Sequence, residues 1–282
     1  MARCLLIVTL SFIWLSTTFS AETPKPQTVR PFVAMDNGLS RVKDLNAKAA
    51  LLKELGYAGI GWRPGRTAEM LKALDAQGLK MFSTYVSIKA DAGAKLNPKL
   101  ADEIKLLKGR GTIVWTTVSK SKRPDQANTV KQLRELADLA AESNLRVALY
   151  PHVGFHVETV KDALELVKLA KHDNLGVSFN LCHFLKSNPE ESLAEVLKAA
   201  APHLMLVQVN GADSGDTRKM GWNRLIKPLG EGTFDMKKVM TLLDEIGYQG
   251  PVALQCYKIS GDDKEHLGRS MKAWRKLNGE SN

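Results

Sequence analysis

The chain has 282 residues, of which 44% are hydrophobic and 25% charged, and its formal net charge is +10. This composition excludes an intrinsically disordered chain, and the length suits one large α/β domain or two small ones. Most basic residues alternate with acids in helical patterns such as KLADEIKLLK (residues 99–108), which is typical of a solvated helix face, so we expect no nucleic-acid partner.

Residues 1–20 have the pattern of an export signal. Arg3 precedes an apolar run over residues 4–15, and small polar residues follow up to a cleavable position near residues 20–21. The alternative is an uncleaved anchor, but the run is shorter than the ~20 residues that a membrane-spanning helix needs. We expect an exported, periplasmic or extracellular protein without a stable membrane anchor, and loss of Arg3 lowers the net charge from +10 to +9.

The segment that follows the signal predicts a linker and then one domain. Residues 21–31, AETPKPQTVRP, are rich in proline, which disfavours a helix there. The domain is expected over residues 32–277, with a short tail at 278–282. Outside the signal the chain has two cysteines, Cys182 and Cys256, too few for a disulfide scaffold even in an oxidising compartment, and whether they pair stays open.

Strand-like apolar runs and helical periods alternate along the whole domain. The strands are expected at FVAM (32–35), AGIGW (58–62), LKMFSTYV (79–86), TIVWTTV (112–118), LRVALY (145–150), LGVSFNL (175–181), LMLVQVN (204–210) and PVALQCY (251–257). Helical patterns cover residues 46–55, 67–77, 125–143, 157–172, 189–201 and 235–246. Gly or Asn stands before several strands, as in ELGYAGI, EIGYQGP, AQGLKMF, ESNLRVA and HDNLGVS, where a left-handed helix cap would lie.

Eight repeated strand–helix units with short turns predict a single closed (β/α)₈ barrel of the α/β class. The alternative is an open, doubly wound sheet. It is disfavoured because MDNGLSRV (35–42), which follows the first strand, lacks the glycine-rich phosphate-binding pattern.

Polar and aromatic residues follow the strands at the end where such barrels build their active sites. These candidates are Asp36, Trp62, Trp115, Tyr150, His152, Asn180, His183, Gln208, Asn210, Gln255 and Tyr257, together with Glu231 in the loop PLGEGTFD. In VSFNLCHFL (177–185), strand alternation would send Asn180 and Cys182 to one side and Phe179 to the other.

The chemistry of these residues predicts a carbohydrate site. Amide side chains carry donors and an acceptor that suit sugar hydroxyls, and Trp62, Trp115 and Tyr257 could stack on a sugar ring. The alternative is that the amides are buried and satisfied by backbone, and that the tryptophans are core residues. For proton transfer the candidates are His152, His183 and Asp36, although each imidazole could instead be structural.

The segments VALYPHVGF, GVSFNLCHFL, MLVQVNGAD, PLGEGTFD and GYQGPVALQCY resemble the xylose isomerase-like TIM barrels, a superfamily of sugar isomerases and epimerases and of endonuclease IV. The resemblance runs from about Phe32 to about Leu277. Metal-dependent members carry Glu, Asp, His and Glu on the last four strands, and this chain has Tyr150, Asn180, Gln208 and Gln255 at those positions, although His152 and His183 are retained.

Loss of the acidic ligands implies that the family's divalent metal site is absent, because neutral amides do not offset dehydration of the ion. We therefore expect no cofactor. An alternative by residue type is Zn²⁺ bound by His152, Cys182 and His183.

The sequence thus predicts an exported sugar isomerase or epimerase-like protein that works by metal-free acid–base chemistry, with elimination as a further reaction class. An unphosphorylated sugar is favoured because Asp262 and Asp263 follow the last strand, where they would repel a phosphate. Two alternatives stay open, a non-catalytic carbohydrate-binding barrel and a zinc-dependent isomerase or lyase. The sequence does not indicate the oligomeric state.

Overall fold

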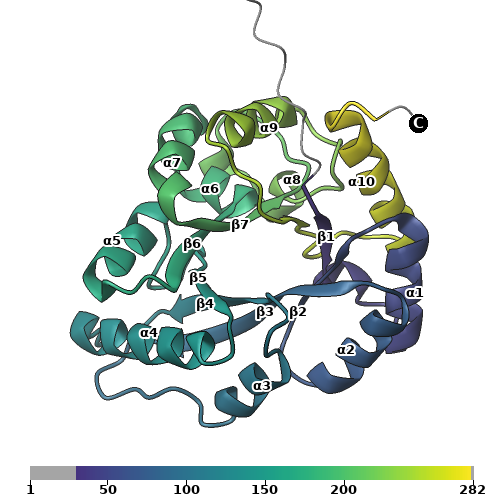
Figure 1. Ribbon diagram of the computed structural model, residues 1–282. Helices are drawn as coiled ribbons and strands as arrows, with labels where there is room; N and C mark the ends of the chain where they lie inside the picture. Colours follow the sequence, from purple (N-terminus) through teal and green to yellow (C-terminus); the bar gives the residue numbers. More distant parts are fainter. Residues whose placement is uncertain (1–29, 281–282) are drawn as a thin grey trace, which may run out of the picture.

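The computed structural model describes residues 30–280, and this part of the chain forms a closed barrel of parallel strands surrounded by helices (Figure 1). Each strand pairs with the next in the sequence, and β1 also pairs with β8. The expected (β/α)₈ barrel is confirmed. The strands are β1 Phe32–Met35, β2 Gly59–Trp62, β3 Lys80–Lys89, β4 Ile113–Ser119, β5 Arg146–Leu149, β6 Leu175–Asn180, β7 Leu204–Val209 and β8 Val252–Leu254.

Helices lie outside the strands on all sides of the barrel (Figure 1). They are α1 Leu45–Leu55, α2 Thr67–Ala76, α3 Leu100–Leu106, α4 Gln126–Ala141, α5 Val160–Ala170, α6 Leu181–Ser187, α7 Leu193–Ala200, α8 Trp222–Leu225, α9 Met236–Glu245 and α10 Asp263–Leu277. Short 3₁₀ helices are η1 Asp36–Leu39, η2 Glu190–Ser192, η3 Ala201–His203 and η4 Thr217–Lys219. Within residues 30–280, no helix is long and apolar enough to cross a membrane. The expected signal lies outside the described residues.

Helix ends follow from local chemistry. Gly56 and Gly247 take left-handed conformations, with φ of 86° and 67°, at the ends of α1 and α9, and Asn144 does the same after α4 with φ of 54°. These positions were expected from the sequence. After α5 the left-handed residue is instead Lys171, with φ of 49°, while Asn174 donates through its side chain to two backbone carbonyls.

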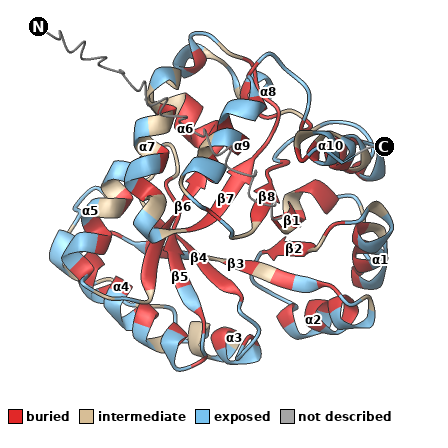
Figure 2. Cartoon of the chain, turned by 45° about the horizontal axis from the view of Figure 1, so that its top comes forward, coloured by how far each residue is buried: buried red, intermediate tan, exposed pale blue. Residues whose placement is uncertain are grey.

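The core has two layers, one between strands and helices and one inside the barrel. Figure 2 shows the strands almost entirely buried and the exposed residues on the outer faces of the helices. Inside the barrel, Met35 lies against Gly61, where an added Cβ would be 2.3 Å from the Met35 sulfur. Gly61 thus has no side chain that projects into the barrel interior, and the Met35 side chain occupies that space. Cys182 and Cys256 are buried and unpaired.

Candidate functional site

A cavity of about 500 Å³ opens at the carboxyl ends of the strands. Its wall is mainly aromatic and polar. The residues that line it are Met35, Asp36, Asn37, Gly61, Trp62, Arg63, Tyr85, Trp115, Tyr150, His152, Val153, His183, Trp222, Ile226, Gln255 and Tyr257. Eight of the predicted site residues therefore line one cavity. This agrees with the rule that barrels of this kind build their sites at the carboxyl ends of the strands.

Asn180 joins strand β6 to helix α6. The strand ends at Asn180, and its side-chain oxygen accepts from the backbone N–H groups of Cys182, at 3.1 Å, and His183, at 3.5 Å. Such an N-cap starts a helix. The expected strand alternation through this segment is therefore wrong. Cys182 and His183 lie in the first turn of α6, and Cys182 donates its thiol to Asn180 Oδ1 at 3.0 Å.

Four neutral residues, Tyr150, Asn180, Gln208 and Gln255, stand at the positions where the resemblance leads one to expect metal ligands, and they lie together inside the barrel. The amide nitrogen of Asn180 donates to Gln208 Oε1 and, at 3.2 Å, to the hydroxyl of Tyr150. Burial raises the pKa of Tyr150, as does the neighbouring Cys182, while hydrogen bonds with Asn180 and Gln255 act in the opposite direction. Tyr150 therefore stays a neutral phenol.

This neutral cluster, Tyr150, Asn180, Gln208 and Gln255, does not fit a divalent ion. The Asn180 amide directs its N–H donors toward the other members, and its oxygen is used by the backbone of α6. Gln208 is fully buried, and its amide nitrogen lies 3.7 Å from the sulfur of Met35. A divalent cation needs acceptor oxygens or neutral imidazole nitrogens that converge on it, and the amide oxygens here already accept from Asn180, Asn37 and backbone N–H groups.

The zinc alternative based on His152, Cys182 and His183 is not supported by the arrangement. Cys182 is fully buried, and burial raises the pKa of its thiol, which disfavours the thiolate that binds zinc. It does not line the cavity. Over residues 30–280, no group of three His, Cys, Asp or Glu side chains converges as metal ligands would.

His152 and His183 face each other across the cavity wall, with ring centroids 4.1 Å apart. The Nδ1 of His152 lies 2.9 Å from the carbonyl oxygen of Val153, which can only accept, so this nitrogen carries the proton. The Nδ1 of His183 accepts from the Val153 N–H at 3.3 Å, so in neutral His183 the proton is on Nε2. The pair therefore offers one free lone pair, on His152, and one free N–H, on His183.

Burial sets the charge of both rings. His183 is 6% exposed, and burial, followed by the neighbouring His152, lowers the pKa of His183 to about 3. Burial also lowers the pKa of His152, partly offset by its bond to Val153. Both imidazoles are therefore neutral at pH 7, which preserves the donor and acceptor pattern.

Asp36 lies in the cavity wall as the partner of two cations. Lys48 of α1 binds one carboxylate oxygen, and the Nε of Arg63 donates to the other at 2.9 Å. Lys48 is buried and its ammonium lies 5.6 Å from the ring centre of Trp62. The predicted role of Asp36 in proton transfer is thus disfavoured, because both of its oxygens are engaged by cations.

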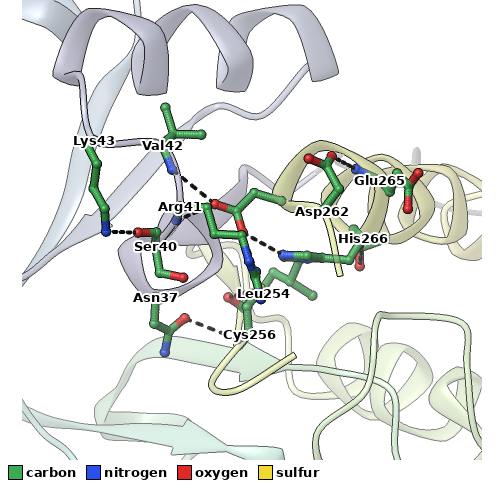
Figure 3. A network of polar contacts seen from close by, with 12 residues as sticks. Asn37, Ser40, Arg41, Val42, Lys43, Leu254, Cys256, Asp262, Glu265 and His266 are labelled. Atoms are coloured by element: carbon green, nitrogen blue, oxygen red, sulfur yellow. Dashed lines mark hydrogen bonds and ion pairs between the residues drawn. The ribbon is translucent and has the colours of Figure 1, made fainter. Parts of the chain in front are cut away.

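Gln255 connects the ends of β8 and β1. Its side-chain oxygen accepts from Asn37 Nδ2 at 2.6 Å and from the backbone N–H groups of Cys256 and Tyr257 at 3.0 and 3.2 Å. The oxygen of Asn37 in turn accepts from the Cys256 N–H at 3.3 Å (Figure 3). These bonds fix the cavity wall where the first and last strands meet.

The loop after η1 is held in place by α10. Asp263 at the start of α10 is 2% exposed and accepts from the backbone N–H groups of Arg41, at 2.7 Å, and Val42, at 3.3 Å, and from the Arg41 guanidinium at 2.9 Å. His266 lies behind the same carboxylate at 3.7 Å. Asp263 is one of the two acids that were expected to repel a phosphate. Its carboxylate faces the protein and not the cavity.

Aromatic rings form the rest of the wall. Trp115 stacks on Tyr150 with centroids 3.8 Å apart, and its indole N–H donates to Ser178 at 2.9 Å. Both are buried members of the barrel interior that also line the cavity. Trp62 donates to the carbonyl of Gly65 at 3.1 Å. Hydrogen bonds within the protein therefore fix both indole groups, and both residues line the cavity.

Four predicted site residues do not line the cavity. Asn210 is fully buried behind β7, where its amide nitrogen donates to the carbonyls of Gly211 and Leu225. Glu231 is in an exposed turn, 3.3 Å from Arg269. Asn180 and Gln208 also do not line the cavity but support it from below through the neutral cluster.

Sequence reasoning did not select several residues that complete the site. Asn37 and Arg63 were recognisable at the ends of the first two strands, beside Asp36 and Trp62, but were assigned no role from the sequence. Val153 contributes only its backbone, which no side-chain argument could find. Trp222 belongs to a helix of four residues in the segment after β7, and its ring lies 5.3 Å from that of His183.

Comparisons with known proteins agree with this geometry. The model of a family described as xylose isomerase-like TIM barrel matches residues 49–277. D-psicose 3-epimerase of Enterocloster bolteae is 23% identical over 224 residues, which are 77% of this chain and 66% of that protein. Inosose isomerase of Bacillus licheniformis is 24% identical over 145 residues, 49% of this chain and 51% of that protein. The chain thus spans less than two thirds of the length of these relatives.

Solved structures with similar folds include two sugar epimerases. A 3-keto-D-glucoside 4-epimerase from E. coli has a TM-score of 0.70 at 17% identity, covering 88% of this chain and 99% of that one. An L-ribulose 3-epimerase has a TM-score of 0.69 at 15% identity, covering 88% and 93%. At these identities the likeness concerns the fold.

Proposed function

Because the chain belongs to the xylose isomerase-like TIM barrel family, we propose that it acts on a sugar by isomerase-type proton transfer that uses imidazole groups instead of a metal ion. The named relatives support sugar chemistry, since they include an epimerase and an inosose isomerase. The neutral cluster supports the metal-free mechanism, because it replaces the family's metal ligands by side chains that bond one another.

The fixed pairing of His152 and His183 supports this proposal most directly. One ring presents a lone pair and the other an N–H, both beside the same cavity. Removal of a proton next to a carbonyl needs a base for the proton and a donor for the oxygen that becomes negative. A neutral imidazole pair with opposite proton positions supplies both.

In the proposed step, a keto or aldo sugar lies with its carbonyl oxygen toward Nε2–H of His183. The Nε2 lone pair of His152 takes the proton from the adjacent carbon. The electron pair of that C–H bond forms the C=C bond of an enediolate, and the carbonyl π pair moves onto the oxygen that His183 binds. The imidazolium of His152 then returns the proton to the former carbonyl carbon, while the hydroxyl proton is passed to the other oxygen. One base serves both transfers, so isomerisation is favoured over inversion at one carbon.

Sugar hydroxyls would be bound by the polar wall at the ends of β1, β2 and β8. Arg63 has an exposed guanidinium beside Asp36, and Asn37 is held toward the cavity by Gln255. Trp62, Trp115 and Trp222 offer ring faces for a pyranose. The described lining holds one carboxylate, Asp36, and it is paired with cations, so a neutral or anionic sugar is suited better than a cationic one.

The experiment is a product assay on unphosphorylated keto and aldo hexoses and pentoses in D₂O, read by NMR. We expect deuterium to enter the carbon next to the carbonyl with the wild-type protein and not with His152→Ala. Exchange that persists unchanged in His152→Ala would overturn the proton-transfer role of the pair.

A second candidate is a non-catalytic carbohydrate-binding barrel. It is favoured by the low basicity that burial gives both imidazoles and by the engagement of Asp36 with two cations. Under this alternative, the same sugars would bind in calorimetry with no exchange and no product. His152→Ala would then change affinity and nothing else.

We also propose that the protein is exported to the periplasm or the extracellular space. The support is the order of Arg3, apolar run and small polar residues over positions 1–20. Amino-terminal sequencing of the protein from a secretion-competent host should begin near Ala21. Retention of Met1 in the exported fraction would contradict the cleavage.

A further inference from the structure

The cavity has two functional sectors that lie on opposite sides of the barrel mouth. His152 and His183 follow β5 and β6, whereas Asn37, Arg63 and Tyr257 follow β1, β2 and β8. In a closed ring of eight strands in sequence order, β1 lies opposite β5 (Figure 1). A strand spacing of ~4.8 Å and a tilt of ~36° give such a barrel a diameter of roughly 15 Å. We call the side formed by Asn37, Arg63 and Tyr257 the outer sector.

The volume of the cavity exceeds what one hexose fills. A water molecule takes up about 30 Å³ in the liquid, so a cavity of about 500 Å³ corresponds to roughly 17 waters. A hexose has about a dozen non-hydrogen atoms, and each takes less room than a water because covalent bonds shorten their spacing. Space for further atoms therefore remains when one sugar ring lies at the imidazoles.

Tyr257 gives the outer sector the character of a stacking surface. Among residues 30–280, the large hydrophobic side chains that are exposed are Leu106, Leu169 and Tyr257, and of these Tyr257 lines the cavity. Tyr257 as a residue is 49% exposed. An aromatic ring that is half in water beside a cavity is suited to stack on the apolar face of a sugar or aryl ring.

The backbone around Tyr257 is held in place before any ligand binds. Gln255 Oε1 accepts the Tyr257 N–H at 3.2 Å, and the next residue, Lys258, has a left-handed backbone with φ of 57°. Such a conformation is uncommon for a residue with a side chain and persists where neighbouring structure determines it. The ammonium of Lys258 lies 5.4 Å from the centre of the Tyr257 ring. The ring is thus held at the rim and does not pack into the core.

We propose that the outer sector is a second ring-binding subsite and that the substrate is a glycoside whose reacting ring itself carries the ketone, with this ring at the imidazole pair and the second ring on Tyr257. This inference rests on the proposed function for the position of the reacting sugar. Arg63 and Asn37 would bind hydroxyls where the two rings join, because Asn37 and the Tyr257 N–H share the Gln255 oxygen and Arg63 lines the same cavity beside Asp36. A free monosaccharide would leave the Tyr257 ring in contact with water.

The test compares matched ligands by isothermal titration calorimetry at equilibrium. The probes are the methyl and phenyl glycosides of glucose, galactose and mannose. We expect the phenyl glycoside of at least one sugar to bind wild-type protein roughly 5- to 10-fold more tightly than its methyl partner, as expected for one aromatic stacking contact. Tyr257→Ala should reduce this preference to less than about 2-fold, and Tyr257→Phe should keep it.

Controls separate this proposal from the catalytic one. Leu169→Ala removes another exposed apolar side chain, on α5, and should leave the preference unchanged. His152→Ala should abolish turnover but retain the preference, so failure of either proposal is visible by itself. The subsite is refuted if wild type shows no preference or binds none of the six probes. It is equally refuted if Trp222→Ala, and not Tyr257→Ala, removes the preference.

Discussion

The imidazole rings of His152 and His183 lie 4.1 Å apart and share the backbone of Val153, whose carbonyl accepts from one ring and whose N–H donates to the other. One peptide segment therefore decides which nitrogen of each ring carries the proton. Several consequences of this arrangement can be measured.

The two imidazoles should contribute unequally to turnover. His152→Gln removes the base and should lower kcat by about 10²- to 10⁴-fold, as is typical of general base loss. His183→Gln keeps a side-chain N–H donor and should lower kcat less, by about 10-fold. Steady-state kinetics on the substrate identified in the exchange assay measures both values. Equal losses would show that His183, too, transfers a proton, as the sequence first suggested.

The pH dependence of kcat/KM should show a limb on the acid side. Burial lowers the pKa of His152 below its usual value near 6.5, and the base is active when neutral. Activity should therefore rise with pH, reach half its maximum below about pH 6.5, and stay level above neutrality. A half-maximum at pH 7.5 or higher would exclude His152 as the base.

Acid should destabilise the fold in part through His183. Its pKa is about 3 in the folded state and ~6.5 in the unfolded state, so the unfolded chain binds the extra proton between these values. Stability is then complete above about pH 6.5 and is lost as the pH falls toward 3. From pH 7 to pH 4, wild type should lose on the order of 3 kcal/mol more unfolding free energy than His183→Gln, measured by urea denaturation.

The matched control for that measurement is the exposed His203. His203→Gln should keep the wild-type dependence of stability on pH. If His183→Gln and His203→Gln behave alike, His183 is not the group that titrates.

Metal affinity should be absent from the wild type and restorable by substitution. After dialysis against a chelator and then against Mn²⁺, we expect less than about 0.1 equivalent of metal in wild type by elemental analysis, because the neutral cluster offers no converging anionic ligands. The quadruple variant Tyr150→Glu, Asn180→Asp, Gln208→His and Gln255→Glu should hold about one equivalent. Asn180→Asp alone should stay near the wild-type value. A stoichiometric metal in wild type would contradict the metal-free proposal.

Asp263 should affect the site without touching it. Asp263→Asn weakens the acceptor of two backbone N–H groups in the loop that follows Asn37, and should lower the unfolding free energy by about 1–3 kcal/mol and raise KM more than it lowers kcat. Arg41→Ala removes the ion pair alone, and because that side chain is 53% exposed the loss should be below about 1 kcal/mol. An Asp263→Asn variant with wild-type KM would show that the loop does not need this anchor.

The barrel could be predicted from the sequence because each strand is an apolar run that a helix and a turn separate from the next. The strand ends were wrong at β8, which stops at Leu254 and not at Tyr257, and at β6, where Leu181 and Cys182 continue the apolar run although the helix has begun. Seven residues of α6 are too few to show a helical period, and the deciding contact is a side-chain cap by Asn180 that also suits a strand end.

The site could be predicted only where strand order determines position. Tyr150, His152 and Gln255 line the cavity because they follow strands directly. Glu231 does not, because η4 and α8 separate it from β7, and it pairs with Arg269 instead. The pairing of Asp36 with Lys48 depends on how α1 packs beside η1, and no pattern of spacing reports such a contact.

The Asn180 side chain has two functions, since its oxygen caps α6 and its nitrogen donates to Tyr150 and Gln208, and together they limit which residue can replace it. An aspartate caps a helix as well as an asparagine does, so α6 would start at the same residue with either side chain. The helix cap is therefore insensitive to the charge at this position, but a buried aspartate would have no N–H to donate to Gln208 and Tyr150. Asn180 and its acceptors Gln208 and Tyr150 are therefore coupled, and we expect an acid at this position to be tolerated only when these neighbours change with it.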